Sequence, residues 1–147
     1  MITNEAGINL IKHYESFSPK LYLCPSNVKT IGFGSTRWFD NQLLQGDEGP
    51  VSEDEGEELL KRDLNHAERM VASLVNVPLT INQFSALVST CQNIGSGNFQ
   101  RSTFRMKLNR RDYDGCANNL WQFRRGGGSV LPGLVRRRES ERRLFIS

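Results

Sequence analysis

Residues 21–36 read Leu-Tyr-Leu-Cys-Pro-Ser-Asn-Val-Lys-Thr-Ile-Gly-Phe-Gly-Ser-Thr, and this stretch decides the fold. Its β-branched and aromatic residues form two short runs separated by Pro25-Ser26-Asn27, a pattern typical of a β-hairpin. The rest of the chain is dominated by helix-period patterns. The sequence therefore predicts a mainly helical α+β fold with one small β region near its N-terminal end.

The expected register of this hairpin suggests a ligand site. A three-residue turn over 26–28 places Cys24 directly opposite Thr30. Because strand side chains alternate, Gly32 and Gly34 are expected on the same face as Thr30. Two glycines leave that face bare, so a flat ligand could approach the backbone there.

Helix signals surround the hairpin on both sides. A first helix is expected over 3–14, where apolar residues recur every three or four positions. Ser52 and Glu55 form a capping box that opens a helix reaching about Asn76, and Thr80 with Gln83 repeats the pattern. Further helices are expected after Ser102, after Asp112, and from about Leu134 to Phe145.

These elements indicate one domain over residues 1–147. We expect a β lobe over about 14–50, a connecting helix over about 52–76, and a helical lobe formed by about 77–147 with the first helix. At 37% hydrophobic and 24% charged residues the composition is globular. No apolar run is long enough for a membrane span, and the first twenty residues lack a signal-peptide core, so a cytoplasmic product is expected.

The charge is distributed unevenly. Residues 1–100 carry 7 basic and 12 acidic side chains, whereas 101–147 carry 12 basic and 4 acidic ones. The C-terminal third therefore favours an anionic partner, such as nucleic acid, anionic lipid or cell wall. For the last helix we expect docking on the core, with a membrane-active face as the alternative.

Some residue types are expected to have structural roles. The three cysteines form no CxxC pair and are expected to be reduced thiols, two of them buried. His13 and His66 are isolated, so no metal is expected. Trp121 and Phe123 are expected in the core, with sugar stacking as the alternative, while Trp38, near the hairpin, is a better candidate for sugar stacking.

Glu15 is the candidate acid. It extends the apolar stripe of Ile8 and Ile11 at the C-terminal end of the first helix. Partial desolvation and the negative end of the helix dipole favour a protonated carboxyl group, which a general acid for glycosidic cleavage requires. An exposed glutamate at a helix terminus is the structural alternative.

The spacing of Glu15, Cys24 and Thr30, followed by Ile31-Gly32-Phe33-Gly34, resembles the catalytic signature of phage-type lysozymes, the endolysins of glycoside hydrolase family 24. The similarity continues through residues 82–88, 93–97 and 131–139. It implies a lysozyme-like fold in which Glu15 is the general acid. Ser16 departs from the glycine that many members have after this glutamate.

The resemblance also implies roles for other residues. Cys24 occupies the second catalytic position, where it could orient water, act as a thiolate base or attack the sugar, and Thr30 would help orient the attacking water or that second group. Gly32, Gly34, Trp38 and Asn93 are assigned to substrate binding. Arg137 and Arg138 are assigned to support of Glu15.

The implied activity is an N-acetylmuramidase that hydrolyses the β-1,4 bond between N-acetylmuramic acid and N-acetylglucosamine in peptidoglycan. It needs no cofactor and acts as a monomer. The enzyme would wait in the host cytoplasm, reach the periplasm through a holin-type pore, and contact anionic outer-membrane lipid through its basic C-terminal region. The alternatives are a lytic transglycosylase on the same bond and, from another class, a basic nucleic-acid-binding protein.

Overall fold

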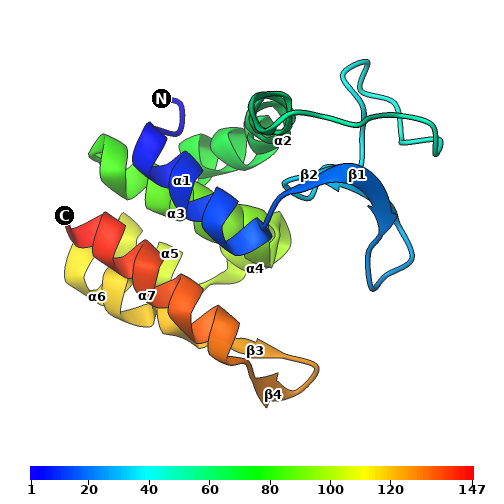
Figure 1. Cartoon of the computed structure of the whole chain (residues 1–147). Coiled ribbons are helices and arrows are strands. Elements are labelled where there is room, and N and C mark those ends of the chain that lie inside the picture. The colour runs from blue at the N-terminus through cyan, green and yellow to red at the C-terminus, as the bar shows by residue number, and fades with distance from the viewer. The chain divides into compact units, whose positions relative to one another are not determined.

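The computed structural model describes residues 1–147, and the chain divides into two compact units. One unit consists of residues 12–65 and contains the predicted hairpin. The other consists of residues 1–11 and 66–147 and is helical apart from one short hairpin. The predicted mainly helical α+β class is confirmed (Figure 1).

The unit of residues 12–65 is built around an antiparallel hairpin of β1 (Ser18–Leu23) and β2 (Lys29–Gly32). One face of this hairpin supplies Ile31, which is fully buried with Leu44, Val51 and Leu59. Phe17, Leu21 and Trp38 pack against the same cluster. The hairpin is therefore held by a small apolar core of its own.

Two helices carry the chain from one unit to the other. Helix α1 (Glu5–Glu15) begins in the unit of residues 1–11 and ends in the hairpin unit. Helix α2 (Glu53–Leu74) begins in the hairpin unit and ends in the helical one. The predicted capping box at its start is confirmed, since the Ser52 amide donates to Glu55 Oε1 at 2.9 Å and the Glu55 amide donates to Ser52 Oγ at 3.1 Å.

The helical unit has a core of aromatic and aliphatic side chains. It contains α3 (Ile81–Ile94), α4 (Ser96–Arg101), α5 (Thr103–Asn109), α6 (Tyr113–Asn119), the 3₁₀ turn η1 (Leu120–Phe123) and α7 (Pro132–Ile146). Helix α7 packs along α3 and also contacts α6 and η1 (Figure 1), so the predicted docking of the last helix is confirmed. The fully buried side chains of this unit include Phe99, Phe104 and Leu120. The Thr80–Gln83 capping box is also confirmed.

Two features of this unit differ from expectation. Residues 125–130 form a hairpin of β3 (Arg125–Gly126) and β4 (Ser129–Val130), which was not among the expected elements. The prediction that Trp121 lies in the core is wrong, because the residue is 51% exposed. Phe123 does pack edge-on against Phe104, with ring centroids 5.9 Å apart.

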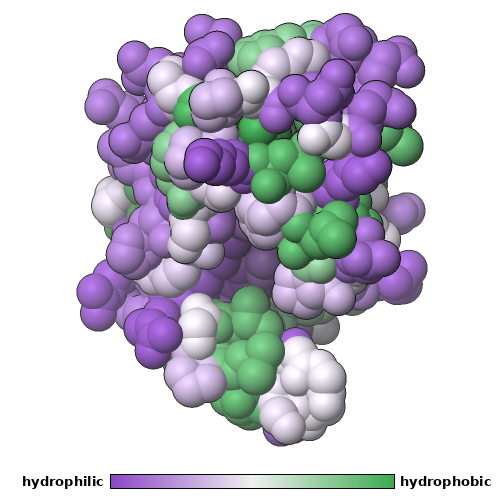
Figure 2. Space-filling model, turned by 45° about the vertical axis from the view of Figure 1, so that its right-hand side comes forward, coloured by the Kyte–Doolittle hydropathy of each residue, from purple (hydrophilic) through white to green (hydrophobic).

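Polar side chains cover most of one face of the molecule (Figure 2). Figure 2 shows a face on which hydrophilic side chains predominate and hydrophobic ones gather in small groups. No helix combines the length and the apolar composition that crossing a bilayer requires. All three cysteines are free thiols, and Cys91 and Cys116 are buried, as expected.

Candidate active site

Glu15 is the last residue of α1, where the chain turns sharply towards the hairpin. The Ser16 amide donates to the Lys12 carbonyl at 3.2 Å, and Ser16 adopts a φ of 58°. This is the left-handed conformation that commonly ends helices and that glycine adopts at least cost. The turn leaves the Glu15 side chain half-buried on the hairpin unit.

A tight reversal after β2 brings the backbone to this carboxyl group. Ile31 and Ser35 exchange two backbone hydrogen bonds of 2.9 Å, so the chain turns over Gly32-Phe33-Gly34. Gly34 has a φ of 90°, and a Cβ placed there would lie 3.2 Å from Glu15 Oε2. A side chain at position 34 would crowd the carboxylate, so the absence of one is what allows this close approach.

Cys24 and Thr30 are close, although not in the predicted register. The structure pairs Thr30 with Tyr22, and Cys24 closes the turn against Val28, donating to its carbonyl at 3.0 Å. The three turn residues are thus 25–27, one position earlier than expected, because Asn27 takes the left-handed conformation at φ 62° with its amide bonded to the Cys24 carbonyl. The shift keeps both side chains on one face, as diagonal neighbours.

The surroundings of Cys24 favour its thiolate. The Val28 amide makes the largest contribution that lowers the pKa of this thiol, followed by the Ser26 amide and the Thr30 and Ser26 hydroxyls, while partial burial opposes the shift. The Thr30 hydroxyl lies 2.9 Å from the Val28 carbonyl, which is a second acceptor for its single proton, and Thr30 is 4% exposed. The turn therefore supplies several donors to a sulfur that remains partly accessible.

Gly32 and Trp38, which were both predicted to bind substrate, pack against other parts of the hairpin unit. The prediction that Gly32 lies on a bare face is wrong: a Cβ at this position would lie 3.3 Å from the Cα of Gly56, so Gly32 lets β2 approach α2 closely. Alternation fails because the strand ends at Gly32 and the chain reverses. Trp38 is half-buried against the Ile31 cluster.

Sequence reasoning missed a polar network beside this loop. The buried Ser35 hydroxyl donates to Asp63 Oδ2 at 2.6 Å, and Arg62 donates to Asp63 Oδ1 at 2.8 Å. The Arg62 guanidinium also donates to the Trp38 carbonyl and, at 2.8 Å, to the Arg37 carbonyl. In the sequence, Arg62 and Asp63 are indistinguishable from a charged pair on the exposed face of a helix. Only their hydrogen bonds to residues 24 or more positions away show that they hold the loop after β2 in place.

The remaining predicted residues lie in the helical unit. Arg138 Nη2 donates to Asn93 Oδ1 at 2.8 Å, and Arg138 Nε lies 2.7 Å from Glu141 Oε1. Arg137 Nε donates to Glu141 Oε2 at 3.3 Å, and the Ser89 hydroxyl donates to the same oxygen at 2.6 Å. Burial lowers the pKa of Arg138, an effect that Glu141 opposes and Arg137 reinforces. The two arginines thus share one buried carboxylate, and support of Glu15 by either stays a prediction.

The chain has no group of three or more His, Cys, Asp or Glu side chains arranged to hold a metal ion. The candidate catalytic groups are a carboxyl group at the end of one helix and a thiol and a hydroxyl on one hairpin. The family model for phage lysozyme matches residues 12–141. The chain belongs to the phage lysozyme family.

Relatives of this phage lysozyme carry endolysin names. It is 34% identical to the endolysin of Acyrthosiphon pisum secondary endosymbiont phage 1, over 100% of this chain and 99% of the relative. It is 37% identical to the endolysin of Bacillus phage B103, of which it spans only 55%. The chain thus covers about half the length of the Bacillus phage relative and nearly all of the other.

Solved structures agree with the family. A mutant of P22 lysozyme superimposes with a TM-score of 0.92 at 33% identity, covering 100% of this chain and 99% of the other. Phage lysozymes are glycoside hydrolases, and this chain is a member of that enzyme family. The predicted family and fold are therefore confirmed.

Proposed function

We propose that this phage lysozyme is an endolysin that hydrolyses the β-1,4 bond between N-acetylmuramic acid and N-acetylglucosamine in bacterial peptidoglycan. The observation that carries the proposal is the approach of the Gly34 backbone to the Glu15 carboxyl group on the same unit as the Cys24–Thr30 pair. Family membership supports a glycosidic substrate, and the endolysin names of the relatives support peptidoglycan.

In the proposed reaction, Glu15 donates its proton to the bridging oxygen as the bond from that oxygen to the anomeric carbon breaks. A water oxygen attacks the anomeric carbon, and Cys24 receives the water proton as a thiolate. The amide and hydroxyl donors of the turn support this role, because they favour the charged sulfur. Thr30 orients the water and the thiolate, while Gly34 keeps the space beside Glu15 free of a side chain.

A murein turbidity assay tests the acid assignment. Glu15→Gln keeps the size of the side chain but removes the proton, so the lytic rate is expected to fall by at least about a hundredfold. Glu5→Gln is the matched control, because Glu5 is an exposed glutamate at the other end of the same helix. Full activity of Glu15→Gln would refute the assignment.

The products distinguish hydrolysis from the alternative reaction on the same bond. Mass spectrometry of the released muropeptides is expected to show reducing ends that incorporate one water. Anhydro ends would instead identify a lytic transglycosylase.

The route and partners of the enzyme are also part of the proposal. We propose that a monomer accumulates in the host cytoplasm and reaches the periplasm through a holin-type pore, where its basic C-terminal region contacts anionic outer-membrane lipid. Induced expression with and without a pore-forming protein tests the route, since lysis should follow only when the pore forms. Flotation with anionic and neutral vesicles tests the lipid contact.

A further inference from the structure

Residues 101–111 carry five basic side chains and no acidic one, and they cover α5 with the turn on either side of it. We call this segment the α5 surface, and its basic residues are Arg101, Arg105, Lys107, Arg110 and Arg111. None of the five forms an ion pair. Asp112 and Asp114 follow, and even with these two carboxylates residues 101–114 keep a net charge of +3. The proposed chemistry gives this positive charge no role.

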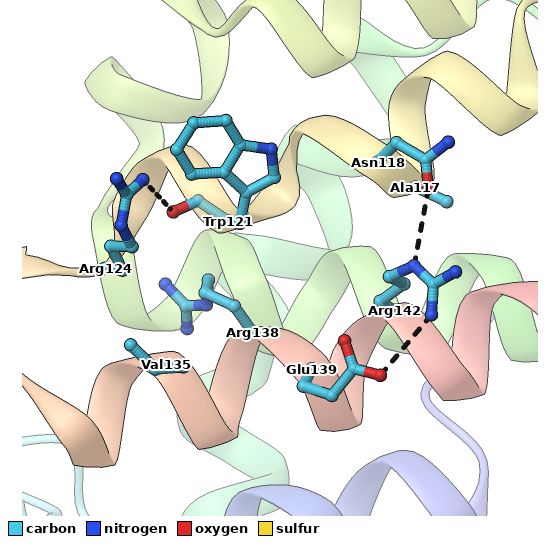
Figure 3. Close-up of a pocket in the computed structure, with 8 residues that line it drawn as sticks. All are labelled: Ala117, Asn118, Trp121, Arg124, Val135, Arg138, Glu139 and Arg142. Carbon is cyan, nitrogen blue, oxygen red and sulfur yellow. Dashed lines mark hydrogen bonds and ion pairs between the residues drawn. The ribbon is translucent and has the colours of Figure 1, made fainter.

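The basic helix α7 differs, because much of its positive charge is used within the protein. Its two buried arginines share the Glu141 carboxylate, so no external partner can reach them. Arg142 and Arg143 both pair with Glu139, and Figure 3 shows the Arg142 guanidinium bonded to Asn118 and Glu139. The basic residues of α5 are therefore better placed than those of α7 to meet an anionic partner.

Tertiary contacts fix α5 on the helical unit and leave cations on its outer side. Phe104 and Leu108 are fully buried, so one face of the helix is anchored in the core. Arg105 donates to the Leu74 carbonyl at 3.2 Å, at the C-terminal end of α2. The two arginines that follow α5 are exposed, and their guanidinium groups make no hydrogen bond within the protein. Their donors are available to phosphate oxygens.

An apolar side chain lies among these cations. Met106 is 43% exposed, and its position on the helix is opposite the face that Phe104 and Leu108 bury. Arg110 follows it by four positions and so lies on the same side of the helix, while Lys107 is its neighbour in sequence. This combination suits an anionic bilayer, where basic groups meet headgroup phosphates and an apolar side chain passes below them.

A shallow hollow of about 400 Å³ lies beside the same turn, and its lining residues are Pro78, Leu79, Thr80, Gln83 and Tyr113. Two hydrogen bonds hold the turn against this segment. Asn109 Oδ1 accepts from the Asn76 amide at 2.8 Å, and the Tyr113 hydroxyl donates to the Pro78 carbonyl at 2.7 Å. The two arginines that follow α5 lie between these bonds, so the chain carries them past the hollow. Lipid methylene groups could enter it while the phosphate stays with the arginines.

Nucleic acid fits the α5 surface less well. Single strands stack their bases on exposed aromatic rings, and the only aromatic residue of this segment, Phe104, is fully buried. A duplex read through its major groove needs a helix whose side chains reach the base edges. Helix α5 has seven residues and buries one face in the core. A lipid surface needs neither feature.

We propose that the α5 surface docks this phage lysozyme on a membrane of anionic phospholipid. Lys107, Arg110 and Arg111 lie against headgroup phosphates, and Met106 enters the interface between them. The choice of a membrane rests on the proposed function, which brings the basic C-terminal region to anionic lipid. Within that region, the contact is made by α5 and not by α7.

Two matched double variants test the location of the contact by flotation with phosphatidylglycerol vesicles. Arg110→Gln with Arg111→Gln removes two positive charges from the α5 surface, and Arg142→Gln with Arg143→Gln removes two from α7. A basic residue at an anionic surface contributes about fivefold in affinity, so the dissociation constant should rise about 25-fold in the first pair. It should rise less than about threefold in the second, because salt screens charges far from the contact. Equal effects would show attraction by net charge alone and overturn the proposal, as would equal binding to neutral phosphatidylcholine vesicles.

A substitution at constant charge tests for lipid against other polyanions. Met106→Gln should weaken binding to phosphatidylglycerol vesicles about threefold, because it removes an apolar contact, and Met106→Leu should bind as wild type does. Neither change should alter the weak binding of a DNA duplex at the same salt concentration. A duplex that binds as tightly as the vesicles would show a general polyanion surface and overturn the lipid assignment, as would an unchanged affinity of Met106→Gln.

Clearing of purified murein by wild type is measured separately, since that substrate contains no membrane. If wild type clears no murein while its vesicle binding depends on Arg110 and Arg111, the proposed hydrolysis fails and the α5 surface stands. If wild type clears murein and the two double variants bind vesicles alike, only the proposal for the α5 surface fails. Thermal unfolding of each variant establishes that it is folded at the temperature of the assay.

Discussion

Placing a methyl group at Gly34 probes the approach of the hairpin to Glu15. Gly34→Ala puts a Cβ 3.2 Å from Glu15 Oε2 on a backbone with φ 90°. Ordinary contacts of a Cβ lie beyond this distance, so the carboxylate must move by a few tenths of an ångström. Because a misplacement of about 1 Å can cost a hundredfold in rate, we expect about a tenfold loss of activity.

Two other glycines calibrate this effect. At Gly127, φ is 58° and nothing lies within 4 Å of a Cβ, so Gly127→Ala measures backbone strain alone, about 1 kcal/mol. Gly34→Ala should cost about as much stability, or slightly more, because its neighbour is the mobile end of a side chain. Gly32→Ala meets the backbone of Gly56 at 3.3 Å, which cannot yield as easily, so about 2–3 kcal/mol is expected.

Thermal unfolding and the murein turbidity assay measure the two effects separately. For a chain of this size, 1 kcal/mol corresponds to a shift in Tm of roughly 2–4 °C. Rates are compared at a temperature where every variant is folded. Only Gly34→Ala should lose activity out of proportion to its stability. A Gly34→Ala enzyme as active as Gly127→Ala would refute the importance of this approach.

Four further outcomes follow from the described contacts. Ser16→Gly should raise the free energy of unfolding by up to about 1 kcal/mol in urea titrations, because Ser16 occupies the left-handed region; a less stable variant would contradict this. The pKa of Cys24 is lowered by amide and hydroxyl donors, so its alkylation by iodoacetamide should become half-maximal at a lower pH than that of free cysteine. Thr30→Val should move that midpoint upwards, and an unchanged midpoint would show that the hydroxyl is not involved. Glu141→Ala should cost about 3–5 kcal/mol in thermal unfolding, because it removes the carboxylate that pairs with the buried Arg138; a loss below 1 kcal/mol would contradict that account.

The helices could be predicted from the sequence because their signals are local. The Ser52 and Thr80 capping boxes each involve residues three positions apart, and both form as expected. Neighbouring residues also sufficed to predict that Glu15 lies at the end of a helix and that the chain turns around Asn27. The spacing of the candidate catalytic residues also sufficed to indicate the family.

The details of the site depended on contacts between distant segments. The register that places Cys24 opposite Val28 rather than Thr30 differs from the expected one by a single position of the turn, and both choices satisfy the strand pattern. The burial of Gly32 follows from its contact with Gly56 on α2. The sequence around Gly32 does not indicate a contact with Gly56, and the sequence around Gly56 does not indicate one with Gly32.

The last helix shows the same limit most clearly. Its sequence spacing correctly indicated a docked helix, yet the charged residues Arg137, Arg138 and Glu141 face the interior, while Val135 is exposed beside Trp121. Charged side chains are normally expected on the protein surface. Here Ser89 and Asn93 on α3 form hydrogen bonds with Glu141 and Arg138, and these bonds allow the two charged side chains to be buried. Local sequence thus determined the helices, the turn and the candidate chemistry. Tertiary packing decided which polar groups are buried, because burial depends on partners that only the folded chain brings together.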